Sequence, residues 1–157
     1  MSSRDLMLPG LFLLLSIILL PDVASAKRTC RISVASVNFG TYTPGTANDV
    51  DTVGQIDARC RGRSGQGQPT SYALLIDGGL SANSADRRMQ NGLSNLAYNL
   101  FQAAARMIIW GDGSGGTAPV FQAIGSRGLF RRQHNIYGRT FAGQSPETGI
   151  YGDHTLV

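Results

Sequence analysis

Short alternating runs of apolar and polar residues dominate the chain after residue 30. Between Gly54 and Cys60, the residues Ile56, Ala58 and Cys60 alternate with polar side chains, a period of two that is typical of a half-buried β-strand. No stretch keeps apolar residues at helical spacing over three turns. The pattern therefore predicts an all-β domain and places Cys60 on the buried face of its strand.

Further strands are predicted where alternation recurs between turn residues. The predicted strands cover residues 32–39 (with a bend or bulge where the phase shifts by one), 54–60, 71–77, 87–89, 96–101, 107–110 and 136–141, and a last strand opens at 150. Seven or so short strands with frequent turn signals predict an immunoglobulin-like sandwich. A loop is expected over residues 120–132, with five apolar side chains: Val120, Phe121, Ile124, Leu129 and Phe130.

Composition agrees with a single β domain. The chain has 157 residues with 42% hydrophobic residues, 15% charged residues and 20 glycines, which argues against a helical bundle, a coiled coil or a charged disordered tail. The net charge of +4 is almost wholly due to arginine, since Lys27 is the only lysine and no basic run occurs. A dedicated nucleic-acid binder is therefore not expected.

A small set of alternating arginines leaves one alternative open. Arg59, Arg61 and Arg63 could line one edge and meet an anionic surface such as lipopolysaccharide or nucleic acid. Alternating arginines near a strand end are more often a solvated face, so both interpretations stand at this point.

The first residues have the pattern of a secretory signal. An apolar stretch from Leu6 to Leu20 is followed by Ala24-Ser25-Ala26, which has small residues at the positions that a signal peptidase reads. An uncleaved membrane anchor is the alternative, but about 15 apolar residues fall short of the roughly 20 needed to span a bilayer. We expect a signal peptide over residues 1–26, a domain over residues 27–157 and export from the cytoplasm.

In an oxidising compartment the two cysteines, Cys30 and Cys60, most simply pair with each other. A metal site is the weaker alternative, because the only histidines, His134 and His154, are far from the cysteines and from each other in the sequence.

The search for catalytic motifs finds little. Residues 111–116 are superficially similar to the Gly-Asp-Ser-Gly-Gly of trypsin-like proteases, but an extra glycine interrupts the motif and both histidines follow the serine. The acidic residues do not have the spacing of a calcium loop or of paired glycosidase carboxylates. We expect no enzyme activity, no metal and no cofactor.

A set of segments, taken together, resembles the spore coat protein U domain family, which occurs in subunits of archaic chaperone-usher pili. The segments are Cys30-Arg31-Ile32-Ser33, Val37 to Tyr42, Gly54 to Cys60, Tyr72 to Gly79, Arg88-Met89, Leu96 to Phe101, Ile109 to Gly113, Tyr137-Gly138-Arg139 and Gly149 to Asp153. The specific signal is the combination of paired cysteines, Trp-Gly-Asp-Gly and the terminal Gly-x-Tyr-x-Asp. The residues assigned to the family motif are Trp110, Gly111, Asp112, Gly113, Tyr137, Gly138 and Arg139.

The resemblance implies an incomplete immunoglobulin-like β-sandwich that is completed by a donated strand. The donor would be a periplasmic pilus chaperone and then a neighbouring subunit, and the partners would include an outer-membrane usher. The first strand and the strand from Ile150 would border the groove. The implied groove and core residues are Ile32, Val34, Tyr72, Leu74, Ile76, Tyr98, Leu100 and Tyr151.

Two departures from the family pattern refine this expectation. Only three residues, Lys27, Arg28 and Thr29, stand between the predicted cleavage site and Cys30, which favours a subunit that accepts a strand without donating one, at a pilus tip. Only four residues follow Asp153, so the final strand looks shortened.

We therefore expect a structural or adhesive fimbrial subunit, with a role in attachment or biofilm formation. The apolar residues of the 120–132 loop are the candidate adhesive contacts. An equally good interpretation is that Phe121 and Leu129 simply cap the sandwich. A stand-alone secreted binding domain with a complete sandwich is the alternative function.

Overall fold

The computed structural model describes residues 29–63, 71–124 and 127–157. It contains seven strands in these ranges: β1 (Thr29–Val34), β2 (Val50–Arg63), β3 (Ser71–Leu74), β4 (Arg87–Asn91), β5 (Ser94–Phe101), β6 (Val120–Ala123) and β7 (Arg127–Thr140). One 3₁₀ turn, η1, covers Gly79–Ser81. The predicted signal peptide lies outside the described residues. No helix in the described part of the chain has the length and apolar character needed to cross a membrane.

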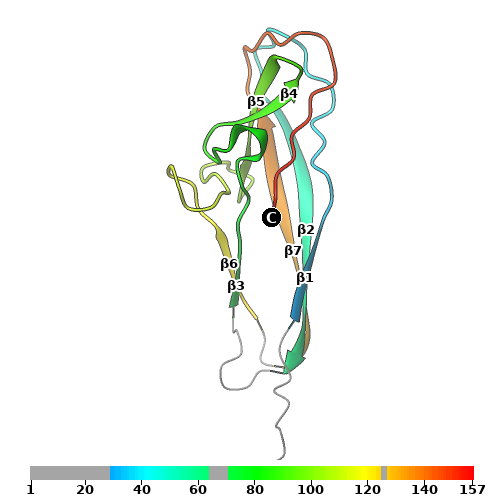
Figure 1. The fold of residues 1–157 in the computed structure, drawn as a ribbon, viewed down its shortest axis with the longest axis vertical. Helices are drawn as coiled ribbons and strands as arrows, with labels where there is room; N and C mark the ends of the chain where they lie inside the picture. Colours follow the sequence, from blue (N-terminus) through cyan, green and yellow to red (C-terminus); the bar gives the residue numbers. More distant parts are fainter. Residues whose placement is uncertain (1–28, 64–70, 125–126) are drawn as a thin grey trace, which may run out of the picture.

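The strands form two antiparallel layers (Figure 1). The larger sheet has the order β1-β2-β7-β5-β4, and the smaller sheet consists of β3 and β6. Figure 1 shows β3 and β6 standing apart from the long β2–β7 ribbon, with the C-terminal segment running between them. The prediction of an all-β, incomplete immunoglobulin-like sandwich is confirmed.

The alternation predicted for residues 54–60 holds in the structure. Ile56, Ala58 and Cys60 are at most 2% exposed, while Gln55 and Arg59 face solvent. Of these, Ile56 belongs to the hydrophobic core cluster that contains Trp110, which is 1% exposed. Because β2 pairs with β7 along its whole length, this alternation sets the inward and outward faces of three neighbouring strands.

Several predicted strands differ from the observed ones: β2 and β7 are longer than predicted, and the strand predicted over 71–77 ends at Leu74. β1 ends at Val34, and residues 107–110 make only isolated bridges, Phe101 with Ile109 and Trp110 with Ala118. The expected strand from Ile150 is also absent, since the only bridge there joins Gly152 to Gln90. Residues 107–110 and 150–157 make only isolated bridges because no continuous neighbouring strand among the described residues runs beside them.

The expected loop over 120–132 is wrong. Val120 and Phe121 lie in β6, whereas Leu129 and Phe130 lie in β7, and the two strands belong to different sheets. Ile124 is buried at 8% exposure, while Phe121 is 74% exposed. The five residues therefore do not form one apolar loop, because alternation along two strands sends them in different directions.

Candidate functional site

The inward face of β1 is not covered by the rest of the described chain. Cys30, Ile32 and Val34 lie opposite the buried Cys60, Ala58 and Ile56 of β2, so they face the same side of the sheet. Ile32 is nevertheless 42% exposed and Val34 is 48% exposed. Ile32 and Val34 therefore line an opening instead of being covered by the second layer, and their place in a groove that accepts a donated strand stays a prediction.

β3 forms the opposite wall of this opening. β3 pairs only with β6, and β1 pairs only with β2 in the described residues, so each strand has one edge without a strand partner. Between them lies a cavity of about 310 Å³ lined by Cys30, Ile32, Ala58, Tyr72, Leu74 and Val157, among others. We call this opening the β1–β3 groove. An open edge beside an apolar groove can accept an added strand through main-chain hydrogen bonds.

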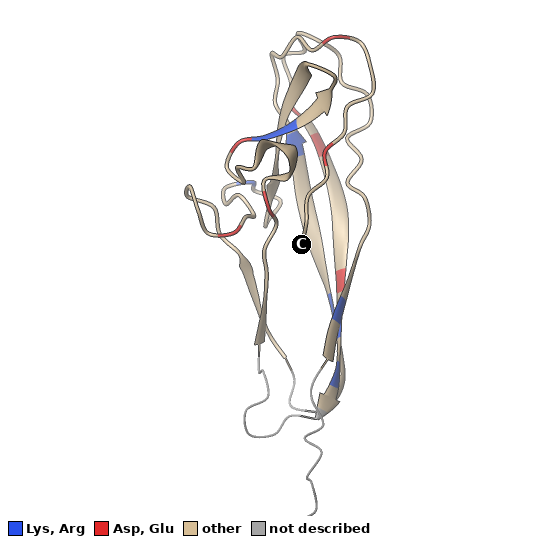
Figure 2. Ribbon diagram, viewed as in Figure 1, with Lys and Arg blue, Asp and Glu red and all other residues tan. Residues whose placement is uncertain are grey.

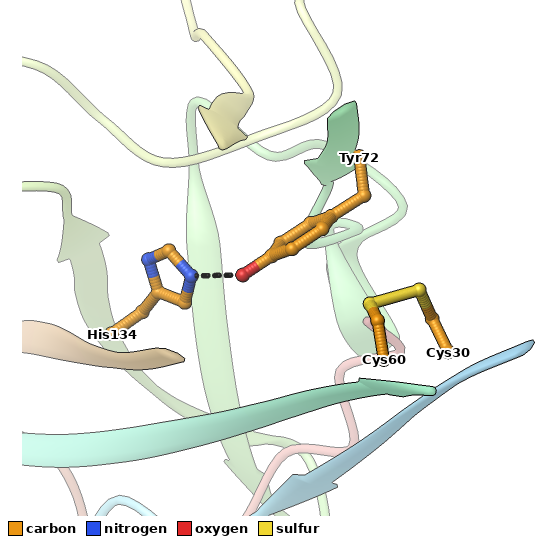
Figure 3. The surroundings of a disulfide bond; sticks show 4 residues. All are labelled: Cys30, Cys60, Tyr72 and His134. Atoms are coloured by element: carbon orange, nitrogen blue, oxygen red, sulfur yellow. Dashed lines mark hydrogen bonds between the residues drawn. A yellow bond between two sulfur atoms is a disulfide. The ribbon is translucent and has the colours of Figure 1, made fainter. Parts of the chain in front are cut away.

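The predicted disulfide stands at one end of the β1–β3 groove (Figure 3). Cys30 and Cys60 are directly paired in the β1–β2 ladder, and the structure joins them by an S–S bond of 2.06 Å. The pairing predicted from the sequence is thus confirmed. Because β1 is an edge strand, this covalent bond ties it to the interior strand β2.

A hydrogen bond between Tyr72 and His134 connects the two layers next to the disulfide (Figure 3). The Tyr72 hydroxyl lies 2.8 Å from Nε2 of His134. Partial burial, together with the charge of Arg132, lowers the pKa of His134. The ring of Trp110 packs edge-on against the His134 ring at 6.3 Å. Sequence analysis did not identify this contact, because Tyr72 and His134 are 62 positions apart and meet only through the packing of the two layers.

The C-terminal segment occupies the other end of the opening. Gly152 exchanges two backbone hydrogen bonds with Gln90, and the Asp77 amide donates to the Leu156 carbonyl oxygen at 3.1 Å. A cavity of about 510 Å³ remains between this segment and the inward residues Val34, Ile76 and Ile136. Leu74, Ile76, Tyr98 and Leu100 are buried as expected, whereas Tyr72 and Tyr151 are only partly buried.

Asp153 anchors this segment to the core. Its carboxylate accepts hydrogen bonds from the Tyr98 hydroxyl at 2.7 Å and from the Leu80 amide at 2.8 Å. Burial, with the bond to Asp153 as a second cause, raises the pKa of Tyr98 far above its ordinary value. The phenol therefore stays protonated and donates to the carboxylate.

The motif residues Trp110 to Gly113 support the second layer. Trp110 donates its indole N–H to the Leu74 carbonyl at 2.9 Å, which fixes the end of β3. Gly111 lies so close to Thr117 and Ser84 that a Cβ would collide with both. The Asp112 carboxylate accepts from the Ser114 amide at 2.9 Å and so closes the turn. These contacts assign the motif to structure rather than to a reacting centre.

The second motif, Tyr137-Gly138-Arg139, lies on β7. Gly138 is needed because the Phe39 ring packs where its Cβ would stand, at 2.8 Å from Cε1. Arg139 forms ion pairs with Asp49 at 3.1 Å and Asp51 at 2.7 Å. The hydrogen bond to Arg139 lowers the pKa of Asp51.

Arg87 is a buried cation that sequence analysis did not identify. Its guanidinium is fully buried and donates to four backbone carbonyls within 3.0 Å, those of Ile76, Asp77, Ser84 and Trp110, and to Asn99 Oδ1 at 2.7 Å. The available signal was its inward register, two residues before the apolar Met89. Arg87 therefore joins the end of β3 to the Trp110 turn.

Metal-ligand groups do not converge in the described part of the chain. No group of three His, Cys, Asp or Glu side chains lies close enough there to hold a metal ion. The features that do converge are apolar side chains and unpaired strand edges. The β1–β3 groove therefore combines an apolar lining with strand edges that have no strand partner among the described residues.

Comparison with known proteins places this fold among its relatives. The chain is 30% identical over 129 residues to Protein U of Myxococcus xanthus, and the match covers 78% of this chain and 69% of that protein. A similar solved structure is the chaperone–tip adhesion subunit pre-assembly complex CsuC–CsuE, from archaic chaperone-usher Csu pili of Acinetobacter baumannii. The likeness has a TM-score of 0.52 at 22% identity, and covers 82% of this chain but 38% of that one.

The family model described as the Spore Coat Protein U domain matches residues 19–157. This match includes every strand, both cysteines of the disulfide and the motifs around Trp110 and Gly138. The chain belongs to the spore coat protein U domain family.

Proposed function

We propose that this chain is a structural subunit of a chaperone-usher fimbria, and that it accepts a donated strand in the β1–β3 groove. The observation that carries the proposal is the uncovered inward face of β1, with Ile32 at 42% and Val34 at 48% exposure. Membership of the spore coat protein U domain family supports it. The chaperone–subunit complex of the similar pilus structure supports a chaperone as the first donor.

The expected donor is an extended segment with apolar side chains at alternate positions. Main-chain hydrogen bonds to the unpaired edge would give affinity, and alternate side chains would fill the cavity beside Ile32 and Leu74. Exposed edges of this kind favour aggregation when no partner covers them. The proposed order is therefore chaperone first and a neighbouring fimbrial subunit second, after passage through an outer-membrane usher.

The proposal includes export. Residues 1–26 act as a signal peptide and residues 27–157 form the exported domain, which passes through the periplasm to a cell-surface fimbrium. The N-terminal sequence of the protein recovered from the periplasm tests this boundary. The subunit has no catalytic role and uses no cofactor, in keeping with a family known from coat and pilus proteins.

A tip position with a role in attachment and biofilm formation is the finer part of the proposal. The similar structure contains a tip adhesion subunit, and this chain exposes Phe121 on β6 at 74%. Replacing Phe121 by Ser in assembled fimbriae should reduce attachment to an apolar surface. Unchanged attachment with normal fimbrial yield would contradict a contact through Phe121.

Co-expression tests strand acceptance directly. The full chain is produced in a periplasm with or without the chaperone from the same gene cluster, and a soluble one-to-one complex is expected only with chaperone. Ile32→Asp should prevent this complex, because a charge would enter the β1–β3 groove. Val53→Asp is the matched control, since Val53 is 54% exposed on the outward face of β2.

Two outcomes would overturn the proposal. Recovery of a cooperatively folding monomer without chaperone would indicate a stand-alone secreted binding domain. Equal complex formation by the Ile32→Asp and Val53→Asp variants would place the chaperone contact outside the β1–β3 groove.

A further inference from the structure

Three arginines form a row across three neighbouring strands of the larger sheet. Arg31 of β1 lies directly opposite Arg59 of β2, and Arg59 lies directly opposite Arg131 of β7. Opposed residues in antiparallel strands have Cβ atoms about 4.5–5.5 Å apart. Arg61 follows Arg59 on the same side, at about 6.6 Å along the strand. We call Arg31, Arg59, Arg61 and Arg131 the arginine face.

The arginine face is on the outside of the sandwich. Cys60 and Ala58, which alternate with these residues on β2, are buried, so the arginines point away from the β1–β3 groove. All four side chains are exposed. Figure 2 shows basic residues gathered toward the end of the β1–β2–β7 layer that lies lower in the view. A strand bound in the groove would therefore leave this face open.

Among the described residues, no acidic side chain forms an ion pair with these four cations. The four ion pairs found among the described residues use Arg88, Arg106 and Arg139, and none uses an arginine of the arginine face. Asp57 shares the outward side of β2, two residues before Arg59, but does not pair with it. Like charges directly opposite each other destabilise a sheet, so the row has an electrostatic cost that a bound anion would remove.

The residues around the arginine face indicate the kind of anion. A guanidinium binds sulfate, carboxylate or phosphate with two parallel hydrogen bonds. The neighbouring outward positions hold short polar or amide side chains able to bond sugar hydroxyls, namely Thr29, Ser33, Gln55 and Gln133. Several guanidiniums within one small area suit a ligand with several anionic groups.

Two other classes of anionic partner fit less well. Outward positions 29–33, 55–61 and 129–133 hold no aromatic residue on which a base could stack, and strands β1, β2 and β7 present no helix to a DNA groove. Leu129, at 48% exposure, is the only apolar side chain at these positions, whereas interfacial membrane binding uses a broad apolar face.

We propose that the arginine face binds an anionic polysaccharide through guanidinium contacts to its sulfate or carboxylate groups. The face takes no part in the proposed strand acceptance, so the two proposals can fail separately. An outward site of this kind engages a polymer that lies across the strands, with one anionic group for each successive arginine of the row.

Binding of the full chain, recovered with its chaperone where needed, to immobilised heparin tests this proposal. The Arg59→Gln/Arg131→Gln variant should lose about tenfold or more in affinity at 0.1 M salt and should show a smaller salt dependence. Arg59→Gln alone should lose less, and Arg88→Gln is the matched single-charge control, expected within about twofold of the wild type. Circular dichroism checks that each variant is folded. The substitutions should not impair folding, because they remove like charges that lie opposite each other.

Each remaining outcome would count against the proposal. Equal losses of heparin affinity for Arg59→Gln and Arg88→Gln would indicate a general charge effect. Equal binding to neutral dextran would show that the anionic groups of the ligand are not recognised. Tighter binding to duplex DNA or to phosphatidylglycerol vesicles than to heparin at the same ionic strength would assign the face to nucleic acid or to a lipid surface instead.

Discussion

The Tyr98 hydroxyl donates a hydrogen bond of 2.7 Å to the Asp153 carboxylate, and this bond joins two residues that are 55 positions apart. Tyr98 is 4% exposed at the centre of β5. Asp153 belongs to the segment that closes one end of the groove, so the bond decides where that segment lies.

Tyr98→Phe should therefore lower the free energy of unfolding by about 1.5–3 kcal/mol, the usual range for a hydrogen bond to a charged group. Chemical denaturation measures the effect. A double-mutant cycle with Asp153→Asn isolates the pair, and additive losses would contradict a direct contribution from this bond.

Arg87 and its neighbour Arg88 should differ in how much stability they lose on substitution by lysine. Arg87→Lys should destabilise the fold by about 3 kcal/mol or more, because the three N–H donors of a lysine cannot satisfy the five buried acceptors that Arg87 serves. Arg88→Lys should change stability by less than about 0.5 kcal/mol, since its pair with Asp86 is exposed. Similar losses for both variants would show that the buried network is not the cause.

Loss of the Cys30–Cys60 bond should release β1. The chain-entropy relation gives about 3.6 kcal/mol for a loop of this length, and β1 has only β2 as a strand partner. Replacing both cysteines by Ser should lower the unfolding free energy and speed proteolysis near β1. Reduction of the wild type should reproduce both effects, and a protease pattern unchanged in both cases would contradict this role.

His134 should make stability depend on pH in the weakly acidic range. Its pKa in the fold is lowered by burial, so the unfolded chain binds a proton more readily as the pH falls below about 6.5. The stabilising contribution is present above this pH and is lost as the pH falls through the native pKa, by less than about 1.4 kcal/mol per pH unit.

Denaturation curves between pH 7.5 and 5 measure this slope. The His134→Gln variant should have a flatter profile, and His154→Gln is the control because its side chain is exposed. An unchanged profile in His134→Gln would assign the slope to other groups.

Gly138→Ala should destabilise the sheet by about 1–3 kcal/mol, the usual cost of overpacking. The new Cβ would meet the Phe39 ring at 2.8 Å and Thr52 Cγ2 at 2.9 Å. Gly152→Ala is the matched control, because nothing lies within 4 Å of its Cβ position. Thermal unfolding compares the two, and equal melting temperatures would contradict the packing argument.

The local sequence pattern was sufficient to predict features that do not depend on which strands pair. The period of two over 54–60 predicted which side chains of β2 are buried, and two cysteines in an exported chain predicted their pairing. It did not predict the end of β1 at Val34 or the separation of Phe121 from Leu129 into two sheets, because strand partners come from distant parts of the chain.

The sequence by itself determined the fold class, the disulfide and the family. Alternation, turn residues and short motifs are local signals, so they can be recognised without knowing which strands pair. Only the tertiary structure decided that Ile32 and Val34 are uncovered, that Arg87 is buried among carbonyls, and that Arg31, Arg59 and Arg131 form one row. Each of these depends on strand register and layer order, which set the surroundings of a side chain through residues distant in the sequence.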